Sequence, residues 1–140
     1  MIGAVLDRLK AQCASVRLFG RIADLAALDA STGAPKSVPA VFVFVNEEAA
    51  AENERINGLL QRNELDVALL IIARNLTDAA GGAAAADIDA LRDQVRGALL
   101  GWSPDGYAPF EAVSGRIVGV RAGYLRYEII LSTAHYLEAS

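Results

Sequence analysis

Few side chains in this chain of 140 residues could carry out chemistry, and they do not form a recognisable catalytic set. The one histidine, His135, has no second histidine with which to bind zinc, and no catalytic triad can be assigned around it. The one cysteine, Cys13, excludes an internal disulfide and falls on the apolar side of a helical pattern, so packing is its expected role. We therefore predict that the chain is not an enzyme and needs no cofactor or metal.

The densest group of possible metal ligands is a set of four glutamates: Glu47, Glu48, Glu52 and Glu54. Clustered carboxylates suit a hard divalent cation, but the spacing lacks the glycine and the alternating Asp or Asn ligands of an EF-hand loop. A solvated acidic segment is the favoured interpretation. Residues 46–62, which contain this group, are expected to form a long exposed excursion, with a solvated helix as the alternative.

Composition indicates a folded, acidic protein. Hydrophobic residues make up 54% of the chain and charged residues 21%, so a single domain over residues 1–140 with one core is expected. No stretch reaches the roughly 18 apolar residues of a membrane helix, and Asp7 and Arg8 interrupt the start too early for a signal peptide, so a soluble cytosolic protein is expected. The net charge of −4, with only Lys10 and Lys36 as lysines, disfavours a nucleic-acid groove.

Strand patterns account for most of the expected architecture, which we class as α+β with a mixed, largely antiparallel sheet. Residues 40–45 and 64–74 are apolar on both faces, so both segments are expected to be central strands covered on each side. A shorter extended passage is expected over residues 16–22. The end of the chain predicts a β-hairpin with arms over residues 111–120 and 124–137.

Two main helices should pack on this sheet. The first spans residues 2–13, and the second runs from an N-cap at Asp87 to Leu99, with Gly101 just after its end. Asp24 is expected to cap only a short helical turn. Because two helices give little cover for two doubly apolar strands, a second layer should come either from another subunit or from hairpin curvature and loops of the same chain.

Aromatic side chains gather near the end of the second helix and in the hairpin: Trp102, Tyr107, Phe110, Tyr124, Tyr127 and Tyr136. Large rigid side chains anchor interfaces when exposed, because they bury much area at a small entropic cost. They also close hydrophobic cores, and a core position is favoured for Trp102. The tyrosines stay open. We therefore take Trp102 and Tyr107, together with the four glutamates, as candidate interaction residues.

The run from Leu91 to Pro104, which ends in Leu-Gly-Trp-Ser-Pro, resembles a segment of phage tail terminator proteins in which a helix leads into Leu-Gly-Trp and a nearby proline. Residues 24–28, the strand at 39–45, the segment 65–75 and the two strands within 115–136 also resemble that family. The resemblance covers nearly the whole chain.

This resemblance implies an assembly protein, because such proteins form hexameric rings that stop tail-tube growth and present a joining surface for the head. It implies self-association into a ring, with a hexamer expected, and contacts with a tail tube protein and a head-tail connector protein. DNA would pass through the ring without specific binding, and no membrane is involved. The protein would act in the host cytoplasm during assembly and in the virion tail or neck afterwards. Residues 47–54 become a candidate lumen or ring-contact loop.

Two other functions are compatible with the same residues. Another neck, minor tail or head-tail completion protein would share the size, the charge and the ring habit. A small α+β enzyme with an unrecognised site belongs to a different class, and a tightly bound metal at full occupancy would favour it.

Overall fold

The computed structural model of the chain describes residues 1–30, 35–74, 82–121 and 123–140. Within these residues the elements follow in this order: α1 (Ile2–Gln12), β1 (Leu18–Gly20), α2 (Ile22–Ala30), β2 (Ala40–Ala50), β3 (Leu59–Arg74), α3 (Gly82–Leu99), β4 (Glu111–Arg121) and β5 (Tyr124–Ala139). The predicted α+β class is confirmed. Among the described helices, none is long and apolar enough to cross a membrane.

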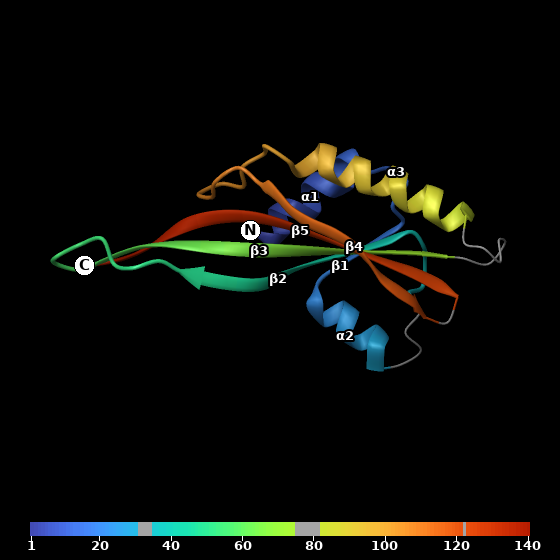
Figure 1. Cartoon of the computed structure of the whole chain (residues 1–140), viewed down its shortest axis with the longest axis horizontal. Coiled ribbons are helices and arrows are strands. Elements are labelled where there is room, and N and C mark those ends of the chain that lie inside the picture. Colours follow the sequence, from blue (N-terminus) through green and yellow to red (C-terminus); the bar gives the residue numbers. More distant parts are fainter. Residues whose placement is uncertain (31–34, 75–81, 122) are drawn as a thin grey trace.

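The strands form one mixed sheet in the order β1-β2-β3-β5-β4 (Figure 1). β1 runs parallel to β2, and the other three pairings are antiparallel. β3 and β5 pair along their whole lengths, from Leu59 opposite Ala139 to Arg74 opposite Tyr124. β4 and β5 form the predicted C-terminal hairpin, which is therefore confirmed, as is the largely antiparallel sheet.

Helices cover both faces of the centre of the sheet. α1 and α3 lie on one face and α2 lies on the other (Figure 1). Alternate residues of β3 divide between the two layers, because successive side chains of a strand point to opposite faces. Val67, Leu69 and Ile71 belong to the cluster with α1 and α3, whereas Leu70 and Ile72 belong to the cluster with α2. A helix of the same chain thus supplies part of the second layer.

α2 is a helix of nine residues where only a short turn was predicted. It begins at Ile22, so Asp24 lies inside the first turn and the predicted N-cap at Asp24 was wrong. The Asp24 carboxylate accepts a hydrogen bond of 2.8 Å from the backbone N–H of Arg21. This contact is one half of a capping box, in which an acidic side chain in the first turn reaches back to the residue before the helix.

α3 also begins earlier than predicted, at Gly82, so the N-cap assigned to Asp87 was wrong. The alanines at 83–86 explain the difference, because alanine has the highest helix propensity and extends the helix upstream. The predicted apolar face is present, since the following residues are buried: Ile88, Leu91, Val95, Ala98 and Leu99.

Residues 46–62, predicted to be a long excursion, are mostly strand. β2 continues to Ala50 and β3 begins at Leu59, so the loop between them is confined to residues 51–58. β5 pairs with the start of β3, and the three strands extend together past the helices (Figure 1). We call residues 46–66 and 132–140 the ribbon. Its polar and small side chains have low β propensity, and pairing between strands supplies the stability that propensity does not.

Gly20 and Gly97 form a matched pair for testing the packing of this fold. A Cβ at Gly20 would lie 2.7 Å from the ring of buried Phe42, whereas a Cβ at Gly97 in α3 would meet nothing within 4 Å. We expect Gly20→Ala to lower the free energy of unfolding by about 1–3 kcal/mol. Gly97→Ala should raise it by up to about 1 kcal/mol, because alanine favours a helix. Chemical denaturation measures both, and a Gly20→Ala variant as stable as the wild type would contradict the close approach of β1 and β2.

Candidate interaction surfaces

The structure separates the four candidate glutamates into two pairs. Glu47 and Glu48 lie on β2, and Glu52 and Glu54 lie in the loop at the tip of the ribbon. All four are exposed. The first pair lines a small cleft of about 150 Å³ together with Ala49, Glu64 and Asp66. Among the described residues, no group of three or more His, Cys, Asp or Glu side chains is arranged to hold a metal ion.

The ribbon is the acidic part of the molecule. It contains seven Asp or Glu residues and two Arg residues, a formal charge of −5, whereas the whole chain carries −4. The remaining residues are therefore close to neutral. Because its carboxylates are concentrated on a projecting set of strands, the ribbon repels phosphate and attracts basic surfaces.

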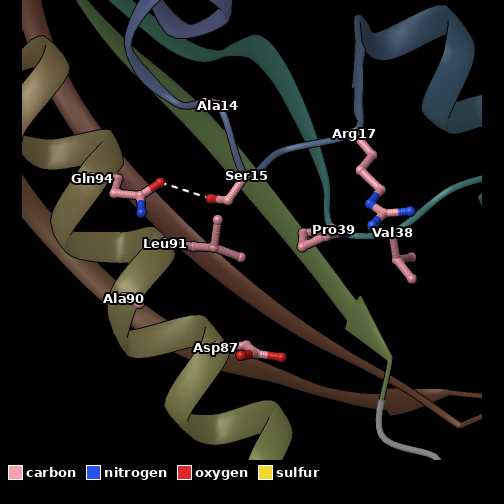
Figure 2. A pocket seen from close by; sticks show the side chains of 9 residues that line it. All are labelled: Ala14, Ser15, Arg17, Val38, Pro39, Asp87, Ala90, Leu91 and Gln94. Carbon is pink, nitrogen blue, oxygen red and sulfur yellow. Dashed lines mark hydrogen bonds between the residues drawn. The ribbon is translucent and has the colours of Figure 1, made fainter.

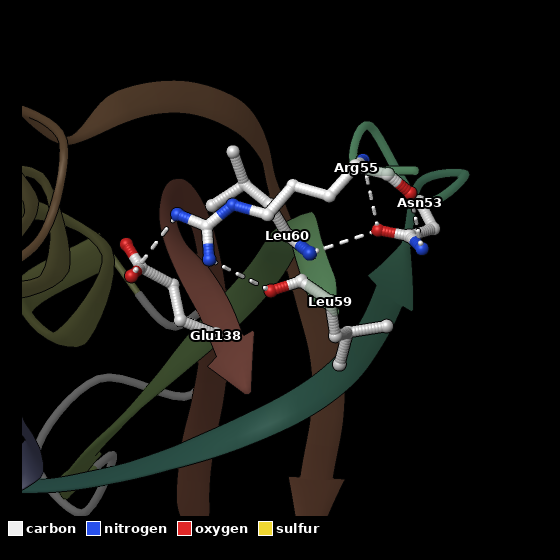
Figure 3. Close-up of polar contacts among 5 residues, drawn as sticks. All are labelled: Asn53, Arg55, Leu59, Leu60 and Glu138. Atoms are coloured by element: carbon white, nitrogen blue, oxygen red, sulfur yellow. Dashed lines mark hydrogen bonds and ion pairs between the residues drawn. The ribbon is translucent and has the colours of Figure 1, made fainter. Parts of the chain in front are cut away.

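Asn53 organises the loop at the tip of the ribbon (Figure 3). Its amide nitrogen donates to the carbonyl oxygens of Arg55 at 3.1 Å and Gly58 at 3.0 Å. Its amide oxygen accepts from the backbone N–H groups of Arg55 at 3.2 Å and Leu60 at 2.8 Å. One side chain thus holds both sides of the loop, as Asn often does in turns. The loop has a defined shape.

The last strand is tied to the same loop. A guanidinium nitrogen of Arg55 lies 3.5 Å from a carboxylate oxygen of Glu138, and a second donates to the carbonyl of Leu59 at 3.5 Å (Figure 3). Both charged side chains are largely exposed, so this ion pair contributes at most about 1 kcal/mol. It links the loop to the end of β5. The loop presents Ile56, whose side chain is fully exposed.

Asn53 and Ile56 were not found by sequence reasoning. A signal for the turn was present in the pair Asn57-Gly58, because Asn followed by Gly is typical of tight hairpin turns. Gly58 has a φ of 92°, a conformation that favours glycine. Exposure of Ile56 has no counterpart in the sequence pattern, since it depends on where the turn falls.

A polar network crosses the base of the ribbon. Asn63 on β3 is 5% exposed, and its amide nitrogen donates to Glu48 at 3.0 Å and lies 3.1 Å from Nε2 of His135 on β5. The Asn63 side chain thus links β2 to β5 across the strand between them. Tyr107 stacks on the His135 ring with 4.7 Å between the centroids. The network gives His135 a structural position and places Tyr107 against β5.

Trp102 follows α3 and lies beside α1 and the residue that precedes β4. Its partly buried ring packs against the main core, 6.2 Å from the ring of Phe110 and 4.9 Å from the guanidinium carbon of Arg8. Arg8 also donates to the carbonyl oxygen of Ala98 at 2.5 Å, which joins α1 to the end of α3. This position agrees with the core interpretation. Contact of Trp102 or Tyr107 with another protein stays a prediction.

β4, one of the two outermost strands, carries a row of exposed apolar side chains that we call the β4 row: Val113, Ile117, Val118 and Val120. Their exposed fractions lie between 49% and 63%. Val113 and Val118 stand at the two register shifts between β4 and β5. An apolar row on an outermost strand is typical of a surface that contacts another protein.

A separate hollow of about 490 Å³ lies between the middle of α3 and the segment that joins α1 to β1 (Figure 2). Ser15 donates to the side-chain oxygen of Gln94 at 2.8 Å across one wall. Arg17 and Asp87 lie well apart in it, and Pro39 and Leu91 are among its apolar residues (Figure 2). An open hollow with scattered polar groups suits contact with a protein surface better than catalysis.

An exposed apolar row on an outermost strand and a projecting acidic ribbon are features expected of a structural protein that assembles with other proteins. The sequence profile of the phage tail terminator protein family matches residues 2–140, so the chain belongs to the phage tail terminator protein family, a family of structural proteins of the phage tail. The predicted family is confirmed.

Comparison with solved structures and curated proteins adds two findings. A chain from the virion of a native gene transfer agent (GTA) particle is similar, with 19% sequence identity and a TM-score of 0.48. The similarity covers 96% of this chain and 92% of that chain. No curated protein sequence matches the chain.

The Asn53→Ala variant tests whether one side chain holds the tip. We expect backbone hydrogen exchange at Arg55 and Leu60 to rise by roughly fivefold to tenfold, because each loses a hydrogen bond worth about 1 kcal/mol. The amides of Val43 and Leu69 in the sheet centre serve as internal controls and should not change. Exchange at Leu60 that stays at the wild-type rate would show that Asn53 does not organise the loop.

Cys13 offers a test of burial at the C-terminal end of α1. The residue is 1% exposed, and burial raises the pKa of its thiol. The folded state therefore favours the neutral thiol. The stability that depends on this neutral thiol is fully present below the unfolded pKa, about 8.5, and is lost as pH rises through the higher folded pKa. We expect the native thiol to react on the order of 100-fold more slowly than the unfolded thiol with a colorimetric reagent at pH 8. Equal rates would contradict the burial.

Proposed function

We propose that this chain is the subunit of a ring, a hexamer, that caps the tail tube of a long-tailed phage and forms the joining surface for the head. Membership of the tail terminator family over residues 2–140 supports this proposal. A tube of stacked rings grows by contacts that never close along its axis. A cap must therefore match the last ring on one face and offer no matching face for a further ring.

In this proposal residues 1–140 act as one domain. The partners are identical copies, a tail tube protein and a head-tail connector protein. Assembly takes place in the host cytoplasm, and the finished ring stays in the tail or neck of the virion.

The observation that carries the proposal is the β4 row. Exposure of these side chains to water is unfavourable, because burial of one large apolar side chain contributes about 1.5–3 kcal/mol of favourable free energy. Covering the row with another protein surface recovers that free energy. A ring of identical copies at a tube end covers it on every subunit at the same time.

The acidic ribbon suits a ring through which DNA passes. We place Glu47, Glu48, Glu52 and Glu54 at the lumen or at the contact between neighbouring copies. Carboxylates do not release counterions from phosphate, so DNA slides past them without being bound. Trp102 and Tyr107 lie on the segment before β4. We propose that they form the aromatic part of the contact between neighbouring copies.

Electron microscopy of the wild-type protein mixed with tubes of the cognate tail tube protein tests the proposal. Rings at one end of each tube are expected, and tubes should have a fixed length in the presence of the protein. Tubes that elongate unchecked, with no ring at either end, would refute the capping function.

Ile117→Lys tests the β4 row in the same assay. The side chain is 63% exposed, so the free energy of unfolding should stay within about 0.5 kcal/mol of the wild type. A lysine in the row should nevertheless abolish rings at tube ends, because its charge would be buried in the contact. Ala11→Lys, at an exposed position of α1, is the matched control and should cap as the wild type does. Normal capping by Ile117→Lys would exclude the row from the contact.

A further inference from the structure

Ile56, at the tip of the ribbon, is an exposed apolar residue that is not part of the hydrophobic core. Its side chain is 100% exposed, the highest value among the large apolar residues that the structure describes. The loop that carries it is held by Asn53 and by the contact between Arg55 and Glu138 (Figure 3). A loop already held in one shape loses less entropy on binding than a slack one. The tip therefore has the properties of an apolar anchor.

An apolar pocket of about 390 Å³ lies beside α2 on the second face of the sheet. Its apolar lining comes from β1, α2 and β2: Leu18, Phe19, Ala27, Leu28 and Phe42. Lys36 and Asp24 supply its charged groups. Figure 1 shows α2 and the tip of the ribbon in separate parts of the molecule, so the tip of one chain does not enter its own pocket.

The ribbon that carries Ile56 and the N-terminal stretch that carries most of the pocket have net charges of opposite sign. Glu52 and Glu54 flank Ile56 on a ribbon with a formal charge of −5. Residues 1–39, which include most of the pocket, contain five basic and three acidic residues and hold both lysines of the chain. A neighbouring hollow shares Phe19 and Asp24 with the pocket, and its other charged groups are Lys10, Arg21 and Asp7. Lys36 is the group of the pocket that attracts the carboxylates of an acidic tip, whereas two acidic tips repel each other.

We propose that Ile56 of one copy docks into the pocket between β1 and α2 of the next copy, with Glu52 and Glu54 beside Lys36. The contact joins two different surfaces, and each copy has one of each. Repeated contacts of this kind close into a ring when the rotation between copies allows it. The inference rests on the proposed function for the existence of the ring, and it assigns the contact between neighbours that the proposed function leaves open.

Disulfide trapping in assembled caps tests the contact directly. The double variant Ile56→Cys with Ala27→Cys places one thiol at the tip and one in the pocket, while native Cys13 is buried. Oxidation on tube ends should give a ladder of linked copies up to the ring size. Ile56→Cys with Ala11→Cys, whose second thiol lies on α1, is the control and should give no ladder.

The outcomes separate this inference from the proposed function. If wild-type rings cap tubes but the tip and pocket cysteines never join, the docking contact is overturned and the capping function stands. The docking contact would equally be overturned by a disulfide between the tip cysteine and a cysteine placed in the end ring of the tube protein. If the wild-type protein forms no rings at all, the capping function fails, and the docking contact fails with it.

Substitution at the tip gives an independent measure. Ile56→Asp should raise the protein concentration needed for half-maximal capping by about 10-fold to 100-fold, the factor that corresponds to losing one buried isoleucine per contact. Asn57→Asp is the matched control, because it adds the same charge to the neighbouring exposed residue and keeps the anchor. Its capping should stay within about threefold of the wild type. Equal effects of both variants would overturn the anchor role of Ile56.

A charge exchange tests the polar part of the contact. Lys36→Glu should weaken capping, because it places a carboxylate beside the acidic tip of the next copy. Adding Glu54→Lys to the same chain restores opposite charges across every contact, so capping by the double variant should recover. A double variant no better than Lys36→Glu alone would overturn the proposed pairing.

Discussion

Sixteen consecutive residue pairs join β3 to β5, and this one ladder spans the whole length of the sheet. Near the helices both strands are buried, and the alternation of apolar side chains fixes their register, because a slip of one residue would turn the core face outward. The same ladder continues into the ribbon, where the side chains are polar. Register set in the core is therefore carried along the strands to the tip loop, which is positioned by packing in a different part of the molecule.

The change from core to ribbon takes place at a buried polar layer. Beyond Leu65 the helix-covered face of β3 presents Asn63, which bonds to Glu48 and His135 on the two neighbouring strands. Thr133, also buried, donates to the carbonyl oxygen of Ala108 at 2.6 Å. These contacts satisfy buried polar groups and join three strands to the segment before β4, so the ribbon starts from a rigid base.

Elements whose own residues carry a clear hydrophobic pattern were predicted from local sequence alone. Residues 40–45 and 64–74 alternate or repeat apolar side chains, and the C-terminal hairpin has two such arms around Gly123, so these were predicted correctly. The strands of the ribbon were missed because their stability comes from partners distant in the sequence, as with Asn63 opposite His135. The N-cap predicted at Asp24 was wrong for a related reason, because Asp24 caps the helix from within its first turn. The exposure of Ile56 depends on where the turn falls in the folded ribbon, so no local pattern predicts it.

An assembly protein has to expose contact surfaces without pairing indiscriminately. β4 interrupts its regular edge with register shifts at Val113 and Val118, and an irregular edge is a poor template for another strand. On the other side of the sheet, β2 pairs with β1 only as far as Phe42 and then carries Glu47 and Glu48 after a shift of its own. Two acidic edges repel each other, so association of like edges is disfavoured. Contacts between unlike surfaces remain, and contacts of this kind are the ones that the proposed ring requires.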